Sequence, residues 1–203
     1  MVALQDKPFR LTPQQFLEWE KTQENRYEYV NGHVIAMAGG TIAHNDICLT
    51  LYRLLYPQVR ASRCRINVAD VKIQMRRRYR YPDLVITCDD LDKVATQLFQ
   101  YPKVIIEVLS PSTESTDRGK KLREYLSIDT LQEYVLVSPS EPLLEVCRRN
   151  SDGTWQYIIY ESGHELRLES LEFTCAIDEI YESIVLDEIV EEPFDIEEQE
   201  VEE

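Results

Sequence analysis

The sequence predicts an α/β fold, in which helices flank a mixed central sheet and a further β-hairpin lies near the C-terminus. Two almost wholly apolar stretches, residues 81–87 and 103–109, are typical of strands in the centre of a sheet. Residues 41–59 and 115–128 show helical spacing of inward-facing positions. A turn at Asp152-Gly153 joins residues 143–148 and 155–160, which predicts the hairpin.

The length and composition favour one globular domain. A chain of 203 residues can bury a substantial core, so we assign residues 1–186 to a single domain and residues 187–203 to an acidic tail that we expect to be disordered. There is no apolar run of membrane-spanning length and no signal-peptide pattern. The five cysteines are scattered, and we interpret them as reduced core residues of a cytoplasmic protein.

The N-terminal part begins with a capped helix and a hairpin. Thr12 is placed to cap a helix that has Pro13 in its first turn and Gln15 three residues beyond the cap. Asn31-Gly32 suits a type I′ turn, and its two-residue closure sets Glu28 opposite Ile35. Glu28 therefore shares a face with apolar residues, where a carboxylate is unexpected.

The long helix over residues 41–59 follows Gly39-Gly40, with Thr41 as its cap. His44 precedes the apolar positions Ile47 and Cys48 by one turn and should project on the core side. It is either a satisfied inward-facing histidine or a member of the site. Residues 63–88 are expected to form three strands, the middle one over residues 68–75.

The C-terminal half should contain a buried strand over residues 133–137, then the hairpin described above. Residues 166–171 form a weaker element, and a short helix near residues 177–185 is expected to close the domain.

Two carboxylates interrupt the two central strands. If the strands pair antiparallel, Asp83 lies beside Glu107. Adjacent ionised carboxylates repel one another and are costly to bury. A divalent cation with oxygen ligands would relieve both costs, so we expect Mg²⁺, or Mn²⁺ in its place, bound by Asp83, Glu107 and the backbone carbonyl of Val108. The alternatives are turn chemistry for Asp83 and a core ion pair for Glu107.

The motif around these acids resembles a known family. Pro82-Asp83, Glu107-Val-Leu-Ser-Pro-Ser-Thr113, and Asp117 with Lys121 and Tyr125 at helical spacing resemble the “putative restriction endonuclease” family that is abundant in cyanobacteria, within the PD-(D/E)XK nuclease superfamily. The resemblance spans about residues 11–160 and implies a restriction-endonuclease-like fold. It also implies that Glu28 supplies an extra acidic group.

The chain departs from the superfamily pattern at one position. Leu109 stands where the superfamily usually has lysine, and the resemblance suggests Lys121 on the following helix as its replacement. The alternative for Lys121 is an ordinary i,i+4 ion pair with Asp117. Asp70, Asp117, His44 and Tyr125 are second-tier candidates, and a tyrosine such as Tyr125 is more often a packing residue.

The charge is unevenly distributed. The net charge is −15, but residues 187–203 hold ten acids and no base, so the other 186 residues carry 27 acids and 22 bases, a net charge of −5. Eight bases and only one acid, Asp70, lie in residues 60–80, and the bases are Arg60, Arg63, Arg65, Lys72, Arg76, Arg77, Arg78 and Arg80. We predict that Arg76, Arg77, Arg78 and Arg80 contact nucleic acid; a solvated hairpin tip is the alternative for the triplet.

Together these features predict a metal-dependent endonuclease that hydrolyses phosphodiester bonds, with double-stranded DNA as the expected substrate. The alternative is a catalytically inactive nuclease fold that serves as a binding or assembly module. The presence of Leu109 in place of the usual lysine favours this alternative. The resemblance also suggests a homodimer. The acidic tail either mimics nucleic acid and covers the basic stretch or serves only for solubility.

Overall fold

The computed structural model describes residues 10–37 and 39–188. Thirteen strands form three sheets among these residues. The five-stranded sheet has the order β2-β1-β5-β4-β7, the six-stranded sheet the order β11-β10-β9-β8-β6-β3, and β12 pairs with β13. Both larger sheets are mixed, because β4 runs parallel to β7 and β8 runs parallel to β9. The α/β class is therefore confirmed, but the expected single central sheet is in fact two.

The elements of the N-terminal half are α1 (Pro13–Glu20), β1 (Tyr27–Val30), β2 (His33–Ala36), α2 (Ile42–Ala61), β3 (Arg65–Val68), β4 (Lys72–Met75), β5 (Arg78–Arg80), β6 (Leu84–Thr87), α3 (Asp90–Val94) and β7 (Leu98–Phe99). The elements of the C-terminal half are β8 (Pro102–Val108), α4 (Glu114–Thr116), a π-helical turn (Asp117–Lys121), α5 (Leu122–Leu126), β9 (Glu133–Val137), β10 (Leu143–Arg149), β11 (Trp155–Glu161), β12 (Glu165–Leu168), a 3₁₀ turn (Glu169–Leu171), β13 (Phe173–Ala176) and α6 (Ile177–Ile180).

The local signals at the N-terminus are confirmed. Thr12 and Gln15 form the reciprocal capping box at α1. Asn31 and Gly32 both have positive φ, as a type I′ turn requires, and Glu28 lies opposite Ile35 in the β1–β2 hairpin. Thr41 caps α2 by accepting a hydrogen bond from His44 N. The cap fixes His44 in the first turn of the helix.

Residues 63–88 form four strands where the sequence suggested three. Ala69 and Asp70 both adopt left-handed φ values, of 49° and 50°. That break separates β3, in the six-stranded sheet, from β4, in the five-stranded sheet. Neither residue is glycine, so the only turn signal in the sequence there is the single Asp70, which is weak.

The predicted hairpin at residues 143–160 is present as β10 and β11, but it is part of the six-stranded sheet. β10 pairs with β9 from Leu144↔Val137 to Arg148↔Glu133, because β9 would otherwise leave an open edge. The separate C-terminal hairpin is β12–β13, in the region expected to hold only a weak element.

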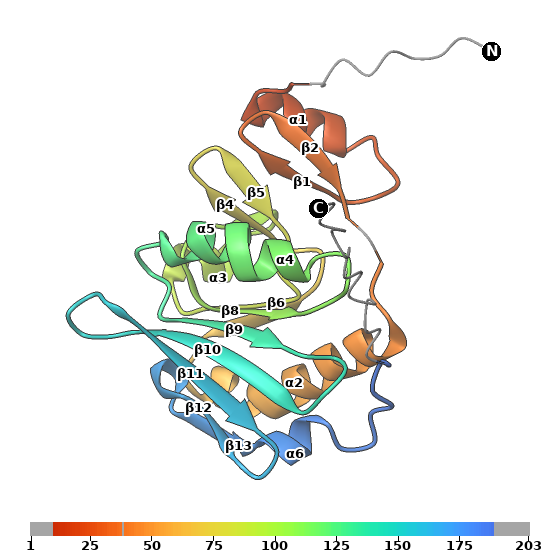
Figure 1. Cartoon of the computed structure of the whole chain (residues 1–203). Coiled ribbons are helices and arrows are strands. Elements are labelled where there is room, and N and C mark those ends of the chain that lie inside the picture. The colour runs from red at the N-terminus through yellow and green to blue at the C-terminus, as the bar shows by residue number, and fades with distance from the viewer. Residues whose placement is uncertain (1–9, 38, 189–203) are drawn as a thin grey trace, which may run out of the picture.

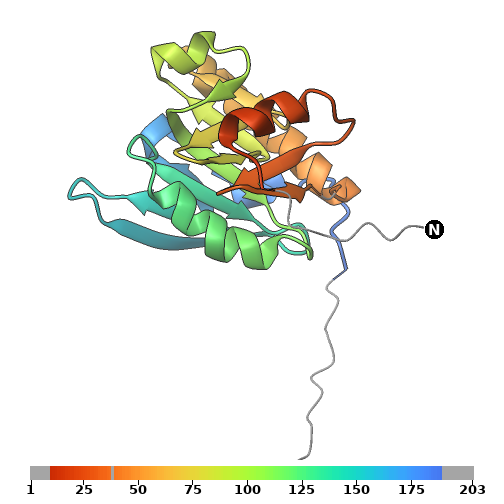
Figure 2. The ribbon, with the colours of Figure 1, turned by 90° about the horizontal axis from the view of Figure 1, so that it is seen from above.

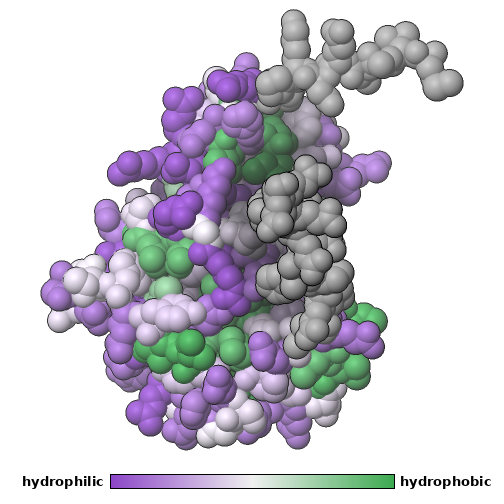
Figure 3. Space-filling model, viewed as in Figure 1, coloured by the Kyte–Doolittle hydropathy of each residue, from purple (hydrophilic) through white to green (hydrophobic). Residues whose placement is uncertain are grey.

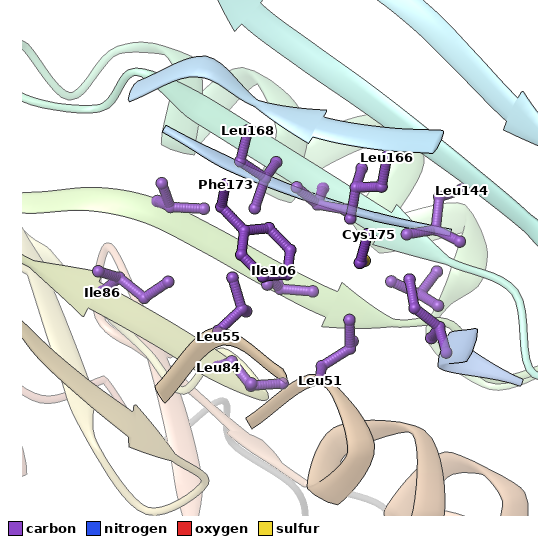
Figure 4. Close-up of a cluster of buried hydrophobic side chains, with 14 of the residues drawn as sticks. Leu51, Leu55, Leu84, Ile86, Ile106, Leu144, Leu166, Leu168, Phe173 and Cys175 are labelled. Atoms are coloured by element: carbon purple, nitrogen blue, oxygen red, sulfur yellow. The ribbon is translucent and has the colours of Figure 1, made fainter. Parts of the chain in front are cut away.

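Helices cover the two faces of the six-stranded sheet (Figures 1 and 2). α2 packs on one face together with β12, β13 and α6, and Figure 4 shows Leu51 and Leu55 of α2 against Leu84, Ile106 and Phe173. The opposite face carries Val85, Ile105, Leu109 and Tyr134 under Tyr125 of the helical segment 114–126. The alternation along β8 therefore points Glu107 toward that helical segment.

The outer surface is mostly hydrophilic on the face drawn in Figure 3, where apolar residues form separate patches. No helix in the described ranges is both long and apolar enough to cross a bilayer. The expected disorder of the acidic tail concerns residues 189–203, which lie outside the described residues. Asp187 is described, and it contacts the domain: its side chain accepts a hydrogen bond from Thr41 Oγ1 at 2.8 Å.

The expectation of five reduced cysteines is wrong for two of them. Cys64 and Cys88 form a disulfide, because the antiparallel pairing of β3 with β6 brings the residues flanking these strands together. Cys48, Cys147 and Cys175 are free and buried.

The disulfide gives a thiol count that can be measured. Unfolding the unreduced protein should expose three titratable thiols, and prior reduction should expose five. The double variant C64A/C88A should lose about 3 kcal/mol of its free energy of unfolding, because the disulfide joins residues 24 apart in sequence and so restricts the unfolded chain. Urea denaturation measures this loss, with C175A as the control. Five thiols before reduction would contradict the disulfide.

Candidate active site

A cavity of about 430 Å³ lies where the two larger sheets, the N-terminus of α2 and the helical segment 114–126 meet. Its lining includes the predicted site residues Glu28, His44, Arg80, Asp83, Glu107, Val108 and Lys121. These residues come from β1, α2, β5, β6–β8 and the π-helical turn. Tertiary structure thus gathers residues that are separated by almost half of the chain.

Asp83 and Glu107 lie side by side at the end of the β6–β8 pair. Leu84 pairs antiparallel with Ile106, so one step further sets Asp83 opposite Glu107, as the sequence predicted. Asp83 Oδ2 accepts a hydrogen bond of 2.7 Å from Val108 N. This bond fixes the carboxylate of one strand against the backbone of the other.

Lys121 is the cation closest to Glu107. Its Nζ lies 3.1 Å from Glu107 Oε1, 2.9 Å from Asp117 Oδ1 and 3.6 Å from Glu28 Oε1. Burial lowers the pKa of Lys121, but these carboxylates outweigh it and raise the pKa, so the ammonium stays charged. The i,i+4 pair with Asp117 and the contact with Glu107 therefore coexist.

The position of Lys121 is explained by the face of β8 that Glu107 occupies. Leu109 lies on that face and is buried in the core beneath Tyr125, while the helical segment passes above. A lysine on the helical segment that packs over this face of β8 can therefore reach Glu107, as Lys121 does. The single π-helical turn Asp117–Lys121 places both of its end residues inward, and such turns often occur at functional sites.

Tyr125 completes the surroundings of Glu107. Its OH donates a hydrogen bond of 2.9 Å to Glu107 Oε1, and the ring is fully buried, so its packing and polar roles are both realised. Burial raises the pKa of Glu107 to about 8; Lys121 opposes this shift, and Asp83, Asp117 and Glu28 add to it. Glu107 is thus a strongly perturbed carboxyl group.

The oxygen atoms left over fit a hard divalent cation. Lys121 and Tyr125 both use Glu107 Oε1, and Val108 N and His44 both use Asp83 Oδ2. Within the described part of the chain, no hydrogen bond reaches Glu107 Oε2 or Asp83 Oδ1. Both residues line the cavity together with Val108, and carboxylate and carbonyl oxygens are the ligands that Mg²⁺ takes.

Glu28 is at the site, but its charge is shared with Arg80. The Arg80 side chain is 1% exposed and pairs with Glu28 and with Glu124, the latter at 2.8 Å. The prediction that Arg80 belongs to an exposed nucleic-acid-contacting group is therefore wrong. A guanidinium between two buried carboxylates is retained in the interior because it neutralises them.

The rest of the basic stretch is also divided. Arg76 and Arg77 are exposed in the β4–β5 turn, whereas Arg78 pairs with Glu124 at 3.2 Å. Lys72 pairs with Glu20, and Arg65 donates hydrogen bonds to backbone carbonyls that include that of Ala95. Nucleic-acid contact by Arg76 and Arg77 stays a prediction.

His44 and Asp70 have different surroundings. His44 Nε2 lies 3.2 Å from Asp83 Oδ2. Burial lowers the pKa of His44, but the hydrogen bond and charge of Asp83 outweigh it and raise the pKa. Asp70 lies in an exposed turn, 3.2 Å from Arg26 Nε, and is not among the residues lining the cavity.

Sequence reasoning missed Glu124 and undervalued Lys120. Glu124 neutralises Arg78 and Arg80 beneath the site, and its only sequence signal was its place on the buried face of the helical segment. Lys120 was not among the predicted site residues, yet it is exposed and lines the cavity beside Lys121.

Comparison with known proteins identifies the family of this chain. The family model Uma2, described as “Putative restriction endonuclease”, matches residues 13–178. The chain belongs to this family. Two relatives come from Synechocystis sp. (strain ATCC 27184 / PCC 6803 / Kazusa). Uncharacterized protein slr1290 is 38% identical over 87% of this chain and 95% of its own length, and uncharacterized protein sll1609 is 28% identical over 71% and 84%.

A solved structure has the same fold. It is described as a “putative nuclease belonging to DUF820” from Anabaena variabilis ATCC 29413, and it matches with a TM-score of 0.72 over 86% of this chain and 99% of that chain. Its sequence identity to this Uma2 chain is 18%, so the likeness is evidence only of a shared fold.

Replacing Arg80 by methionine should strongly destabilise the protein. The apolar side chain would leave Glu28 and Glu124 without their shared cation, which costs about 3–5 kcal/mol for a buried network. Arg77→Met, on the exposed turn beside the same strand, should change stability by less than about 0.5 kcal/mol. Urea denaturation measures both; equal effects would show that Arg80 is not a buried counter-charge.

The raised pKa of Glu107 predicts how stability varies with pH. Between the ordinary carboxyl pKa of 4.5 and about 8, the unfolded chain releases a proton that the folded metal-free protein retains, so rising pH favours unfolding. Glu107→Gln should remove this loss and become more stable than wild type above pH 8, by up to a few kcal/mol. Urea denaturation with a chelator at pH 5 and pH 8.5 tests this, with exposed Glu182→Gln as control. A wild-type advantage at pH 8.5 would contradict it.

Proposed function

We propose that this protein is a metal-dependent endonuclease that hydrolyses phosphodiester bonds of double-stranded DNA. The observation that carries the proposal is the pairing of Asp83 with Glu107 at a cavity, with the Lys121 ammonium 3.1 Å from Glu107. Asp83, Glu107 and the Val108 carbonyl would hold Mg²⁺, with Mn²⁺ as a substitute. Such an ion polarises the scissile phosphate and lowers the pKa of a bound water.

The side chains have distinct roles in this proposal. Lys121 is a compact charge at the cavity wall that orients the attacking water and stabilises negative charge developing on the phosphate. Tyr125 positions Glu107 through its hydrogen bond, and Glu28 and Asp117 hold the lysine. Because these groups are buried and mutually bonded, little reorganisation is needed when substrate arrives.

Cations at the cavity support an anionic substrate. Lys120 is exposed on the cavity lining, and the exposed Arg76 and Arg77 offer further contacts to phosphate groups. The family description, “Putative restriction endonuclease”, supports DNA as the polymer. The proposal includes a homodimer, which the family resemblance suggests, because two copies of the site would cut both strands of a duplex in one encounter.

A second candidate is a nuclease fold without activity that binds or assembles. Lys121 already contacts Glu107 and Arg80 already pairs with Glu28 without any metal, which favours this alternative. Titration calorimetry with Mg²⁺ separates the two functions. Absence of binding at millimolar Mg²⁺ by a folded protein would favour the inactive module.

The proposed function predicts the activity of four variants. Wild type should nick supercoiled plasmid with Mg²⁺ or Mn²⁺, and D83N, E107Q and K121M should each lose about 100-fold or more, because each removes a group that stabilises the transition state. Lys120→Met should retain most activity at saturating DNA, since this side chain contacts substrate from the rim. Timed gel assays measure the rates.

The control variant is Arg123→Met, an exposed change two residues from Lys121. Thermal unfolding of each variant separates lost chemistry from lost structure. Nicking by E107Q or K121M at the wild-type rate would refute the assignment of the site.

A further inference from the structure

A second set of metal-binding side chains lies on the α2 side of Asp83. His44 and Cys48 are one helical turn apart on α2, and His44 Nδ1 lies 3.9 Å from Cys48 Sγ. His44 Nε2 lies 3.2 Å from Asp83 Oδ2. One ligand atom from each of the three residues can be chosen so that all lie within 4.8 Å of one another. The 3.9 Å and 3.2 Å distances start from different ring nitrogens, so an ion bound through one nitrogen of His44 requires a small movement of the Cys48 or Asp83 side chain toward it.

The imidazole in this group is held in place. The backbone N–H of His44 donates a hydrogen bond to Thr41 Oγ1, which fixes the first turn of α2. The backbone of Gly40 packs against the ring, since a Cβ at residue 40 would lie 2.7 Å from His44 Nδ1. Any other residue at position 40 would have to displace the imidazole or the loop. Preorganisation of this kind favours a ligand over a freely rotating surface histidine.

The donor set differs from that of the proposed Mg²⁺ site. Thiolate and imidazole ligands suit zinc and related transition metals, whereas Mg²⁺ takes oxygen. We propose that His44, Cys48 and Asp83 form a Zn²⁺ site, with a fourth position open to the cavity. Zn²⁺ takes such tetrahedral mixed sulfur, nitrogen and carboxylate sets.

The cavity gives an ion access to this site. The side chains of His44 and Asp83 are 19% and 23% exposed and line the cavity, while Cys48 lies buried beneath them. Among the residues that the structure describes, this trio alone combines three such ligands within reach of one ion. Cys147 and Cys175 are also free and buried but belong to no such group, so they provide matched controls.

The site shares Asp83 with the proposed nuclease centre. An ion held by His44 and Cys48 would draw Asp83 away from the pair it forms with Glu107. Zn²⁺ binds nitrogen and sulfur donors far more tightly than Mg²⁺, so low concentrations should suffice. We therefore expect Zn²⁺ to inhibit the Mg²⁺-supported activity; this consequence rests on the proposed function, whereas binding itself does not.

Binding is tested on the full chain with its three free cysteines kept in the thiol form. Co²⁺ serves as a spectroscopic substitute for Zn²⁺, and calorimetry is done with Zn²⁺ itself. Wild type should show a sulfur-to-cobalt charge-transfer band and the intense visible bands of tetrahedral Co²⁺. Cys48→Ala should abolish the charge-transfer band and weaken Zn²⁺ binding by about 100-fold or more, and His44→Ala should weaken binding similarly. Cys175→Ala should match wild type.

Several results would overturn the site. They are Zn²⁺ binding that is unaffected by Cys48→Ala, a charge-transfer band that is lost in Cys175→Ala, or an octahedral Co²⁺ spectrum without sulfur. Cys48→Ser and thermal unfolding in chelator control for misfolding of the alanine variant. In nicking assays, Cys48→Ala should keep the Mg²⁺-supported rate and lose most of its inhibition by micromolar Zn²⁺. If wild type has no nuclease activity, the spectra still decide the metal site.

Discussion

The buried ammonium of Lys121 is the interaction on which the site depends. It contacts Glu107, Asp117 and Glu28, which come from β8, the π-helical turn and β1. Each carboxylate would be expensive to bury alone, and one cation in their midst offsets part of that cost. The same contacts tie both larger sheets to the helical segment between them. The geometry of the cavity is therefore inseparable from the charge balance inside it.

A second cation supports the first. Arg80 pairs with Glu28 and joins it to Glu124, so one of the three carboxylates around Lys121 is itself held by a guanidinium. Alternating charges of this kind make a buried network that is rigid only when every member is present. The raised pKa of Glu107 indicates that the metal-free balance is incomplete. Among the described residues, a carboxyl group with a raised pKa lies beside oxygen atoms that accept no hydrogen bond, which is typical of a functional site.

Asp83 stands at the boundary between two kinds of ligand. On one side lie Glu107 and the backbone of β8, which offer oxygen; on the other lie His44 and Cys48, which offer nitrogen and sulfur. The hydrogen bond from Val108 N holds Asp83 on the oxygen side, and the contact with His44 draws on the same oxygen atom. The kind of ion that the cavity binds thus depends on whether Asp83 shares it with Glu107 or with His44 and Cys48.

The sequence by itself determined the local structures and the pairing of the acids. The capping box at Thr12, the Asn31-Gly32 turn and the antiparallel strands that join Asp83 to Glu107 follow from short-range chemistry and an apolar pattern. Tertiary structure decided the rest. The break at Ala69 that makes two sheets, the burial of Arg80 and the meeting of Cys64 with Cys88 carry at most a weak local signal. Whether a charged side chain is solvated or buried depends on partners distant in sequence, and Glu124 is 44 residues from the Arg80 that it neutralises.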